Sequence, residues 1–186
     1  MRATRWIVGA LLLAAVVLAV KYTRHYFVAK NFYAVEPGLC RGGKQSGRVF
    51  SQLLREHHFK TVISLAGEFP EERKAAEAAG ARYLVFKWKG SGLGPFDEYQ
   101  QVAKLLQDPA LRPVFYHCFG GEKRTNAATF AYLIETGLPP ETAFARLEPY
   151  GFSKADDTQL YAHLQEYVTW RELQRAHTAS PATAHK

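Results

Sequence analysis

The segment that most restricts the fold of this chain joins a short apolar strand to a helix through a glycine-containing loop. Residues 113–117 (PVFYH) are typical of a buried strand, and residues 124–136 (RTNAATFAYLIET) are typical of a helix that ends at Gly137. Only residues 118–123 separate them, and two of these are glycine. A strand that passes so directly into a helix is typical of α/β proteins.

The rest of the chain alternates in the same way. We expect a short strand near 39–41, a helix over 49–58, a strand over 61–65, a helix from Pro70 to Gly80, a strand over 82–88, and helices over 96–107, 140–148 and 154–175. The sequence therefore predicts one α/β domain over residues 31–175, with a mainly parallel central sheet of about four to five strands and helices on both faces. Residues 176–186 are predicted to be a disordered tail.

The amino-terminal region differs from this pattern. Residues 6–20 (WIVGALLLAAVVLAV) are apolar without interruption and are flanked by Arg2, Arg5, Lys21 and Arg24. A helix of this length spans roughly 22 Å, slightly short of a bilayer core, and the following tyrosines can extend it. A cleaved secretory signal has a similar core, but small residues of a cleavage site do not follow it here. The sequence therefore predicts a single-pass membrane anchor within residues 1–30, with its orientation left open because basic residues lie on both sides.

The charge distribution argues against a nucleic-acid partner. The net charge is +7, but residues 1–30 hold five of the Lys and Arg residues and no Asp or Glu, so most of the excess flanks the apolar run. The remainder of the chain is nearly balanced, which weakens any inference from a high isoelectric point. The two cysteines are too few for a disulfide framework or a cysteine-rich zinc module.

The chemistry of the chain is concentrated in residues 117–125, which read H-C-x5-R-T. Five residues between Cys118 and Arg124 let the backbone wrap into a cradle whose N–H groups converge on one point, at a helix amino terminus that suits a phosphate. The same field favours the thiolate of Cys118, a nucleophile, and the planar guanidinium of Arg124 can contact two phosphate oxygens. Thr125 is placed to donate a hydrogen bond to the sulfur, and His117 to orient the loop. The substrate-binding residues are predicted to be Phe119, Gly120, Gly121, Glu122, Lys123 and Arg124.

This motif closely resembles the signature of the cysteine-based protein tyrosine phosphatase superfamily. The upstream segments LCRGGKQS and FKTVISLAGE resemble small, membrane-anchored bacterial members of the dual-specificity phosphatase family, and the likeness covers roughly residues 36–152. The resemblance implies a tyrosine/dual-specificity phosphatase-like fold and activity on phosphotyrosine, phosphoserine or phosphothreonine proteins. It also implies a cysteinyl-phosphate intermediate that water hydrolyses, with no metal or cofactor.

Three positions depart from the family pattern. Asn126 stands where the family commonly has glycine, and we expect it to alter packing rather than chemistry. Glu122 puts a carboxylate inside the cradle, next to Lys123. The strand over 61–65 continues as S-L-A-G-E where many family members have N-L-R, so an arginine is missing, and Arg41 or Lys44 is expected to take its place in contacting substrate.

The general acid is the residue that the sequence specifies least. The reaction needs a protonated carboxyl for the leaving oxygen, and Asp97 follows the glycine-containing loop 88–95 ahead of the signature. The alternative for Asp97 is a purely structural role in the first turn of a helix. Glu98, Glu68 and the absence of a dedicated acid are the other possibilities.

Two further alternatives stay open. The first keeps the fold but makes the chain an inositol polyphosphate or pyrophosphate phosphatase, as Lys87, Lys89, Lys123 and Arg124 suggest; the second is a non-catalytic phosphate-binding module. The expected partners are thus a phosphorylated protein or a small anionic phosphate, together with a membrane. Cys40 is predicted to be a buried small residue, with a redox pairing to Cys118 as the alternative.

Overall fold

The protein is built around a five-stranded mixed sheet. The computed structural model describes residues 6, 12–13 and 28–179. The strands are β1 (Tyr33–Glu36), β2 (Leu39–Gly43), β3 (Thr61–Ser64), β4 (Arg82–Val85) and β5 (Val114–Cys118), in the order β1-β2-β5-β3-β4. β2, β5, β3 and β4 are parallel, and only β1 is antiparallel to its neighbour. The predicted α/β fold with a mainly parallel sheet is confirmed.

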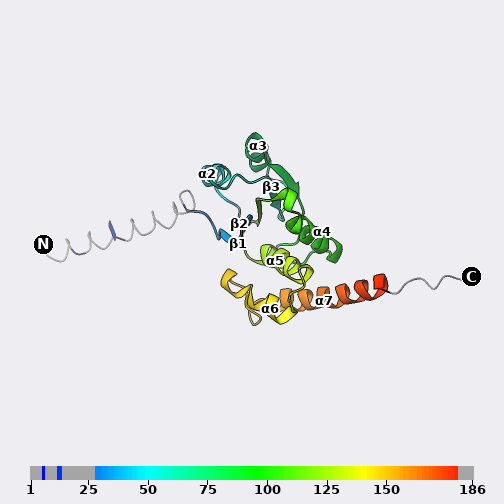
Figure 1. The fold of residues 1–186 in the computed structure, drawn as a ribbon. Helices are drawn as coiled ribbons and strands as arrows, with labels where there is room; N and C mark the ends of the chain where they lie inside the picture. Colours follow the sequence, from blue (N-terminus) through cyan, green and yellow to red (C-terminus); the bar gives the residue numbers. More distant parts are fainter. Residues whose placement is uncertain (1–5, 7–11, 14–27, 180–186) are drawn as a thin grey trace, which may run out of the picture.

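Helices cover both faces of this sheet (Figure 1). The helices are α2 (Gly47–His57), α3 (Pro70–Ala78), α4 (Phe96–Gln107), α5 (Lys123–Glu135), α6 (Pro140–Ala145) and α7 (Thr158–Ala179). Because successive strand residues point to opposite faces, Val62 packs in the core under α2 and α3, whereas Ile63 packs in the core with α4 and α5. The helices α6 and α7 lie outside α5, which is therefore buried along most of its length.

Local sequence explains the helix ends. Ser46 caps α2 by accepting a hydrogen bond from the backbone N–H of Val49, and His58 ends the helix in a left-handed conformation at φ 48°. Pro70 begins α3, with Glu71 and Glu72 in its first turn. The proline and the two glutamates are the signals that placed α3 in the sequence, whereas α2 was placed by the helical spacing of its apolar residues.

Several boundaries differ from the sequence expectations. The strand predicted over 82–88 ends at Val85, after which Lys87 makes only an isolated bridge to Ala66. The last helix begins at Thr158 instead of 154, because Ser153 and Asp157 exchange hydrogen bonds in a turn that precedes it. It continues to Ala179, into the segment predicted to be a tail, and residues 180–186 lie outside the described residues. The antiparallel strand β1 was not predicted at all.

The expected membrane localisation is contradicted. Within the described part of the chain, no helix combines the length and the hydropathy that crossing a bilayer requires. The apolar run that suggested an anchor, residues 6–20, lies outside the described residues apart from 6, 12 and 13. The single-pass anchor and the membrane partner inferred from it are therefore withdrawn.

Candidate active site

The signature residues occupy the carboxyl end of the central strand. β5 lies between β2 and β3, and Cys118, its last residue, is in register with Gly43 of β2. The loop 119–122 follows and leads directly into α5 at Lys123. In parallel α/β sheets the carboxyl ends of the strands are where ligands bind. The structure thus brings together His117, Cys118, Arg124 and Thr125, as the motif predicted.

Cys118 is buried and its sulfur is surrounded by donors. The Thr125 hydroxyl donates to Sγ at 3.0 Å, and the backbone N–H of Gly121 donates to it at 3.2 Å. Burial by itself raises the pKa of this thiol, but the hydroxyl, the N–H groups of Gly121 and Glu122 and the charge of Arg124 together hold it below its ordinary value. The site therefore favours the thiolate, which is the nucleophilic form.

Arg124 has a buried N–H donor without an acceptor among the described residues. Its Nε is buried and lacks a hydrogen-bond partner in the part of the chain that the structure describes. A buried guanidinium N–H without a hydrogen bond is destabilising. This donor at the loop is therefore available to a ligand that carries acceptor oxygens. The neighbouring Lys123 instead lies 3.6 Å from the carboxylate of Asp157, and Glu122 accepts from Asn31 Nδ2 at 3.2 Å. Both of these charged side chains are thus engaged with other parts of the protein.

Paired glycines let the loop lie directly on the end of β2. Gly121 has φ +81°, and a Cβ there would stand 2.5 Å from the Gly43 nitrogen and 2.7 Å from the Gly42 carbonyl carbon. A Cβ on Gly43 would in turn stand 2.8 Å from the Gly120 oxygen. Side chains at Gly43 or Gly121 would therefore push the cradle off the strand. The sequence analysis assigned no role to Gly42 and Gly43, although a Gly-Gly pair at a strand end is a readable signal of close backbone approach.

Arg41 does not take the substrate-contacting role that the sequence suggested for it. Its side chain is fully buried beneath the loop. The guanidinium donates to the Gly121 carbonyl at 3.0 Å, to Asn126 Oδ1 at 2.7 Å and to Thr129 Oγ1 at 2.8 Å. Arg41 therefore supports the cradle from below, and Asn126 is its acceptor rather than a neutral packing change.

Lys44, the other candidate for the missing arginine, lies beside the loop mouth. Its backbone N–H donates to the Phe119 carbonyl at 3.2 Å, and its Nζ stands 4.0 Å from the centre of the Phe69 ring. Lys44 lines a cavity of about 1050 Å³ together with Lys30 and Phe119. Phe119 is exposed, so this cavity adjoins the opening of the cradle.

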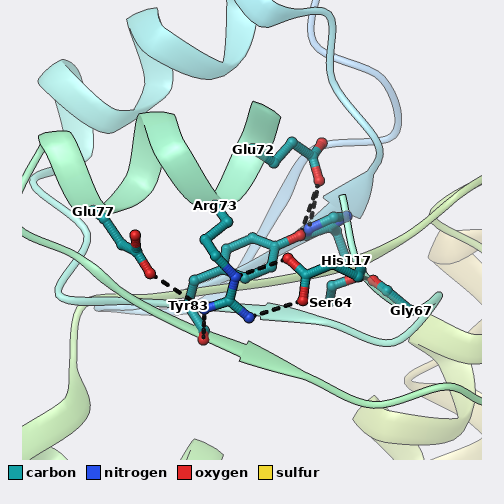
Figure 2. A network of polar contacts seen from close by, with 8 residues as sticks. Ser64, Gly67, Glu72, Arg73, Glu77, Tyr83 and His117 are labelled. Carbon is teal, nitrogen blue, oxygen red and sulfur yellow. Dashed lines mark hydrogen bonds and ion pairs between the residues drawn. The ribbon is translucent and has the colours of Figure 1, made fainter. Parts of the chain in front are cut away.

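His117 belongs to a buried polar group on the α3 side of the sheet (Figure 2). Its Nε2 lies 3.5 Å from Glu72 Oε2, which also accepts from the Tyr83 hydroxyl at 3.3 Å. Burial lowers the pKa of His117 to about 4 and raises the pKa of Glu72 to about 7. His117 is therefore neutral near neutral pH, and its Nδ1 lies 3.4 Å from the Cys118 carbonyl oxygen, while its orienting role stays a prediction.

The three candidate acids have different surroundings. Glu98 accepts from the Trp88 indole N–H at 2.7 Å. Glu68 pairs with Arg73 at 2.8 Å, and this hydrogen bond lowers the pKa of Glu68, so its carboxylate stays ionised (Figure 2 shows Arg73). Asp97 lies exposed in the first turn of α4 and has no hydrogen-bond or ion-pair partner among the described residues. Of the three, Asp97 is the carboxyl that is free to meet a substrate.

The loop before Asp97 is held in place rather than loose. The Tyr99 hydroxyl accepts from Gly94 N at 3.2 Å and donates to the Gly92 carbonyl, and His163 Nε2 lies 2.9 Å from the Gly94 oxygen. A Cβ on Gly92 would stand 2.9 Å from the Lys123 oxygen, so this loop touches the start of α5. The segment that leads to Asp97 thus borders the cradle.

Cys40 is not placed for a disulfide with Cys118. Both thiols are free and buried. Cys40 is in register with Phe115, three residues from Cys118, which corresponds to about 10 Å along a strand. A disulfide requires Cα atoms within about 7 Å. Cys40 also packs in the core under α2 and α3, whereas Cys118 packs with α4 and α5, so it is a core residue.

Comparison with known proteins places this arrangement among phosphatases. No protein-family model and no curated protein sequence matches the chain. Among solved structures, TpbA from P. aeruginosa is 25% identical with a TM-score of 0.58, covering 75% of this chain and 84% of that one. Two further structural neighbours are described as a PP-IP phosphatase and a putative phosphatase. A variant of Tk-PTP shares the fold at 16% identity and a TM-score of 0.66, covering 76% of this chain and 97% of that one. The catalytic core of the PP-IP phosphatase Siw14 from S. cerevisiae shares it at 21% identity and a TM-score of 0.60, covering 72% of this chain and 85% of that one.

Proposed function

We propose that this chain is a cysteine-dependent phosphatase that hydrolyses phosphomonoesters of tyrosine, serine or threonine in proteins, with residues 31–175 as its catalytic domain. The observation that carries the proposal is the environment of Cys118, whose sulfur accepts hydrogen bonds from Thr125 and Gly121 inside a loop that also buries the unsatisfied Nε of Arg124. One site therefore offers a thiolate, a ring of N–H donors and a free guanidinium. These are the groups that phosphoryl transfer to sulfur needs.

The first chemical step follows from these positions. The Cys118 thiolate attacks phosphorus, an S–P bond forms, and the ester P–O bond breaks with its electron pair on the leaving oxygen. Arg124 and the loop N–H groups bind the equatorial oxygens, where negative charge is concentrated in the transition state. We assign the proton for the leaving oxygen to Asp97, because the loop before it touches Lys123 and its carboxyl has no other partner among the described residues.

The second step returns the enzyme to its starting state. Water attacks phosphorus and gives a proton to Asp97, and the S–P bond breaks with its electron pair on Cys118. Thr125, whose hydroxyl donates to Sγ at 3.0 Å, stabilises the thiolate as it leaves. Inorganic phosphate is then released from the cradle.

A second candidate substrate class has its own support. Lys30 and Lys44 line the cavity beside Phe119 and offer positive charge next to the loop mouth. A small polyphosphorylated molecule, such as an inositol polyphosphate or pyrophosphate, would place a second phosphate there. Siw14, one of the structural neighbours, is titled a PP-IP phosphatase. A variant of TpbA was solved in complex with pTyr, which parallels the first candidate.

One experiment tests the proposal and separates the candidates. The full chain is assayed for phosphate release against phosphotyrosine and phosphoserine peptides, an aryl phosphate and inositol polyphosphates, with Cys118→Ser as the matched variant. We expect turnover of the peptides and the aryl phosphate and none with Cys118→Ser. Preference for the inositol compounds favours the second candidate. No turnover of any phosphate, or an equally active Cys118→Ser protein, rejects the proposed function.

A further inference from the structure

Arg41 is a buried cation without a carboxylate partner. Its side chain has no exposed surface, and none of its hydrogen bonds in the described part of the chain goes to an Asp or Glu. Its guanidinium carbon also lies 4.1 Å from the centre of the Tyr150 ring. A buried charge is retained at a large cost unless it is compensated. The groups that interact electrostatically with Arg41 include Tyr116, Tyr150 and the sulfur of Cys118.

The hydrogen bonds of Arg41 join three elements around the loop. From β2, its Nη2 reaches the Gly121 carbonyl of the loop and Asn126 in α5, while its Nη1 reaches Thr129 one turn further along α5. Thr129 in turn shares a hydrogen bond with the Tyr116 hydroxyl at 2.8 Å. The planar guanidinium fixes the direction of each of these bonds, which a flexible ammonium group would not do.

The bond to Gly121 has a consequence on the other side of the same peptide. A trans peptide unit is planar, so the carbonyl of Gly121 and the N–H of Glu122 point in opposite directions. Arg41 holds the carbonyl below the loop, which directs the Glu122 N–H up toward the sulfur. That N–H is one of the groups that lower the pKa of Cys118.

We propose that Arg41 is a positioning residue that fixes the Gly121–Glu122 peptide so that its N–H faces the sulfur and the bound phosphate, with Asn126 holding Arg41 in place. The expected effect of Arg41 on turnover rests on the proposed function, whereas its effect on the pKa of the Cys118 thiol does not depend on any substrate. Asn126 is the family departure noted in the sequence, and its Oδ1 accepts at 2.7 Å the bond that a glycine cannot accept. The network is thus a feature of this chain's own residues.

Other charged and titratable groups lie close to Cys118 along the chain and define the controls. Arg124 approaches from α5, His117 precedes Cys118 on β5, and Glu122 lies in the loop. His117 is neutral near neutral pH, and among the described residues Arg124 lowers the pKa of Cys118 by its charge while Arg41 interacts electrostatically with the same sulfur. Arg171 is the matched control: it is a mostly buried arginine bonded to Glu135, at the end of α5 opposite the loop.

The test is titration of the Cys118 thiol in the full-length protein, followed by ultraviolet thiolate absorbance, with the signal of Cys118→Ser subtracted to remove Cys40. The variants are Arg41→Met, Arg41→Lys, Asn126→Ala and Arg171→Met, each checked for its melting temperature. We expect Arg41→Met to raise the thiol pKa by about one unit and Arg41→Lys by less, because it keeps the charge. Asn126→Ala, which leaves the Arg41 cation in place, is expected to raise the thiol pKa by a smaller amount. Arg171→Met is expected to lower only the melting temperature.

Turnover supplies the second readout. For Arg41→Met we expect kcat to fall roughly 10-fold or more while KM changes little, since the misplaced N–H acts on the transition state. A wild-type thiol titration in folded Arg41→Met or Asn126→Ala overturns the inference, as does an equal shift in Arg171→Met. If Arg41→Met does not fold, Arg41→Lys and Asn126→Ala decide the question. Shifted titrations in a protein that hydrolyses no phosphate would reject the proposed function and leave the positioning role standing.

Discussion

The two sides of the cradle are built differently. Beneath the loop, Arg41, Asn126, Thr129 and Thr125 form a connected set of buried hydrogen bonds that ends on the sulfur of Cys118. On the side of the leaving group, Asp97 stands exposed in a first helical turn without a partner among the described residues. The fold itself thus holds the proposed nucleophile in place, whereas the proposed acid makes no contact that would hold it. Substitutions on the two sides should therefore reduce turnover in different ways.

The largest loss that we expect comes from the preorganised side. Arg124→Lys keeps the charge but replaces a planar fork with a point donor, so kcat/KM should fall roughly 100-fold to 1000-fold for every substrate. Steady-state kinetics on peptide and aryl phosphates measure this loss. Arg171→Lys, a control far from the loop, should leave kcat/KM near the wild-type value. A loss of only a few-fold in Arg124→Lys would mean that the guanidinium does not bind the phosphate.

The next effect belongs to the exposed side and depends on the substrate. Asp97→Asn should slow esters of poor leaving groups roughly 100-fold, while an aryl phosphate with an acidic phenol should lose far less. The basic limb of the pH–rate profile should also flatten. Glu98→Gln, which keeps an acceptor for Trp88, is the neighbouring control. Equal losses for both substrates in Asp97→Asn would leave this aspartate a helix-start residue, and a selective loss in Glu98→Gln would make Glu98 the acid.

A smaller effect is expected where the preorganised side touches the second step. Thr125→Ala removes the hydroxyl that donates to Sγ at 3.0 Å. Because this hydrogen bond lowers the pKa of Cys118, its loss raises that pKa and makes the thiolate a poorer leaving group. We expect turnover to fall about 10-fold and the cysteinyl-phosphate to accumulate, as rapid-quench experiments with labelled substrate would detect. Thr136→Ala, at the far end of α5, should behave as wild type. Absence of accumulation would place the role of Thr125 in the first step alone.

The smallest effect concerns stability and tests the buried pair of Glu72 and His117 on the α3 side of the sheet. Burial raises the pKa of Glu72 from 4.5 to about 7, so the folded state binds more protons than the unfolded state between these values and stability is lost as pH rises through that window. His117, lowered from 6.5 to about 4, contributes the opposite slope over pH 4 to 6.5, which leaves Glu72 alone above that range.

Glu72→Gln should therefore stabilise the protein more at pH 8 than at pH 5, by a difference on the order of 1 kcal/mol in the free energy of unfolding. Urea denaturation at both values measures it. Glu71→Gln, an exposed neighbour in the same helical turn, is the control and should show no such dependence. A pH-independent effect of Glu72→Gln would indicate that Glu72 is not protonated by burial.

Some elements of the fold were predictable because their signals are local. The helix bounds 96–107 agree with α4 residue for residue, and Pro70 begins α3, since periodicity and end signals lie within a few neighbouring residues. β1 was missed because a four-residue strand at the sheet edge, half exposed, has no apolar run to identify it. The predicted membrane localisation was wrong, because no helix among the described residues is long and apolar enough to cross a bilayer.

The sequence by itself determined that Cys118 and Arg124 lie at the two ends of a short loop between a strand and a helix, because their spacing fixes the size of a cradle whatever surrounds it. Only the tertiary structure decided what lies beneath that cradle. Arg41 is 80 residues from Gly121 and 85 from Asn126, and nothing in its local sequence shows that β2 brings it under the loop. The raised pKa of Glu72 likewise depends on its burial, which exists only where α3 packs against the strands that carry His117 and Tyr83. Spacing within a motif is a property of the chain, whereas burial and the partners of a charge exist only once distant elements have packed together.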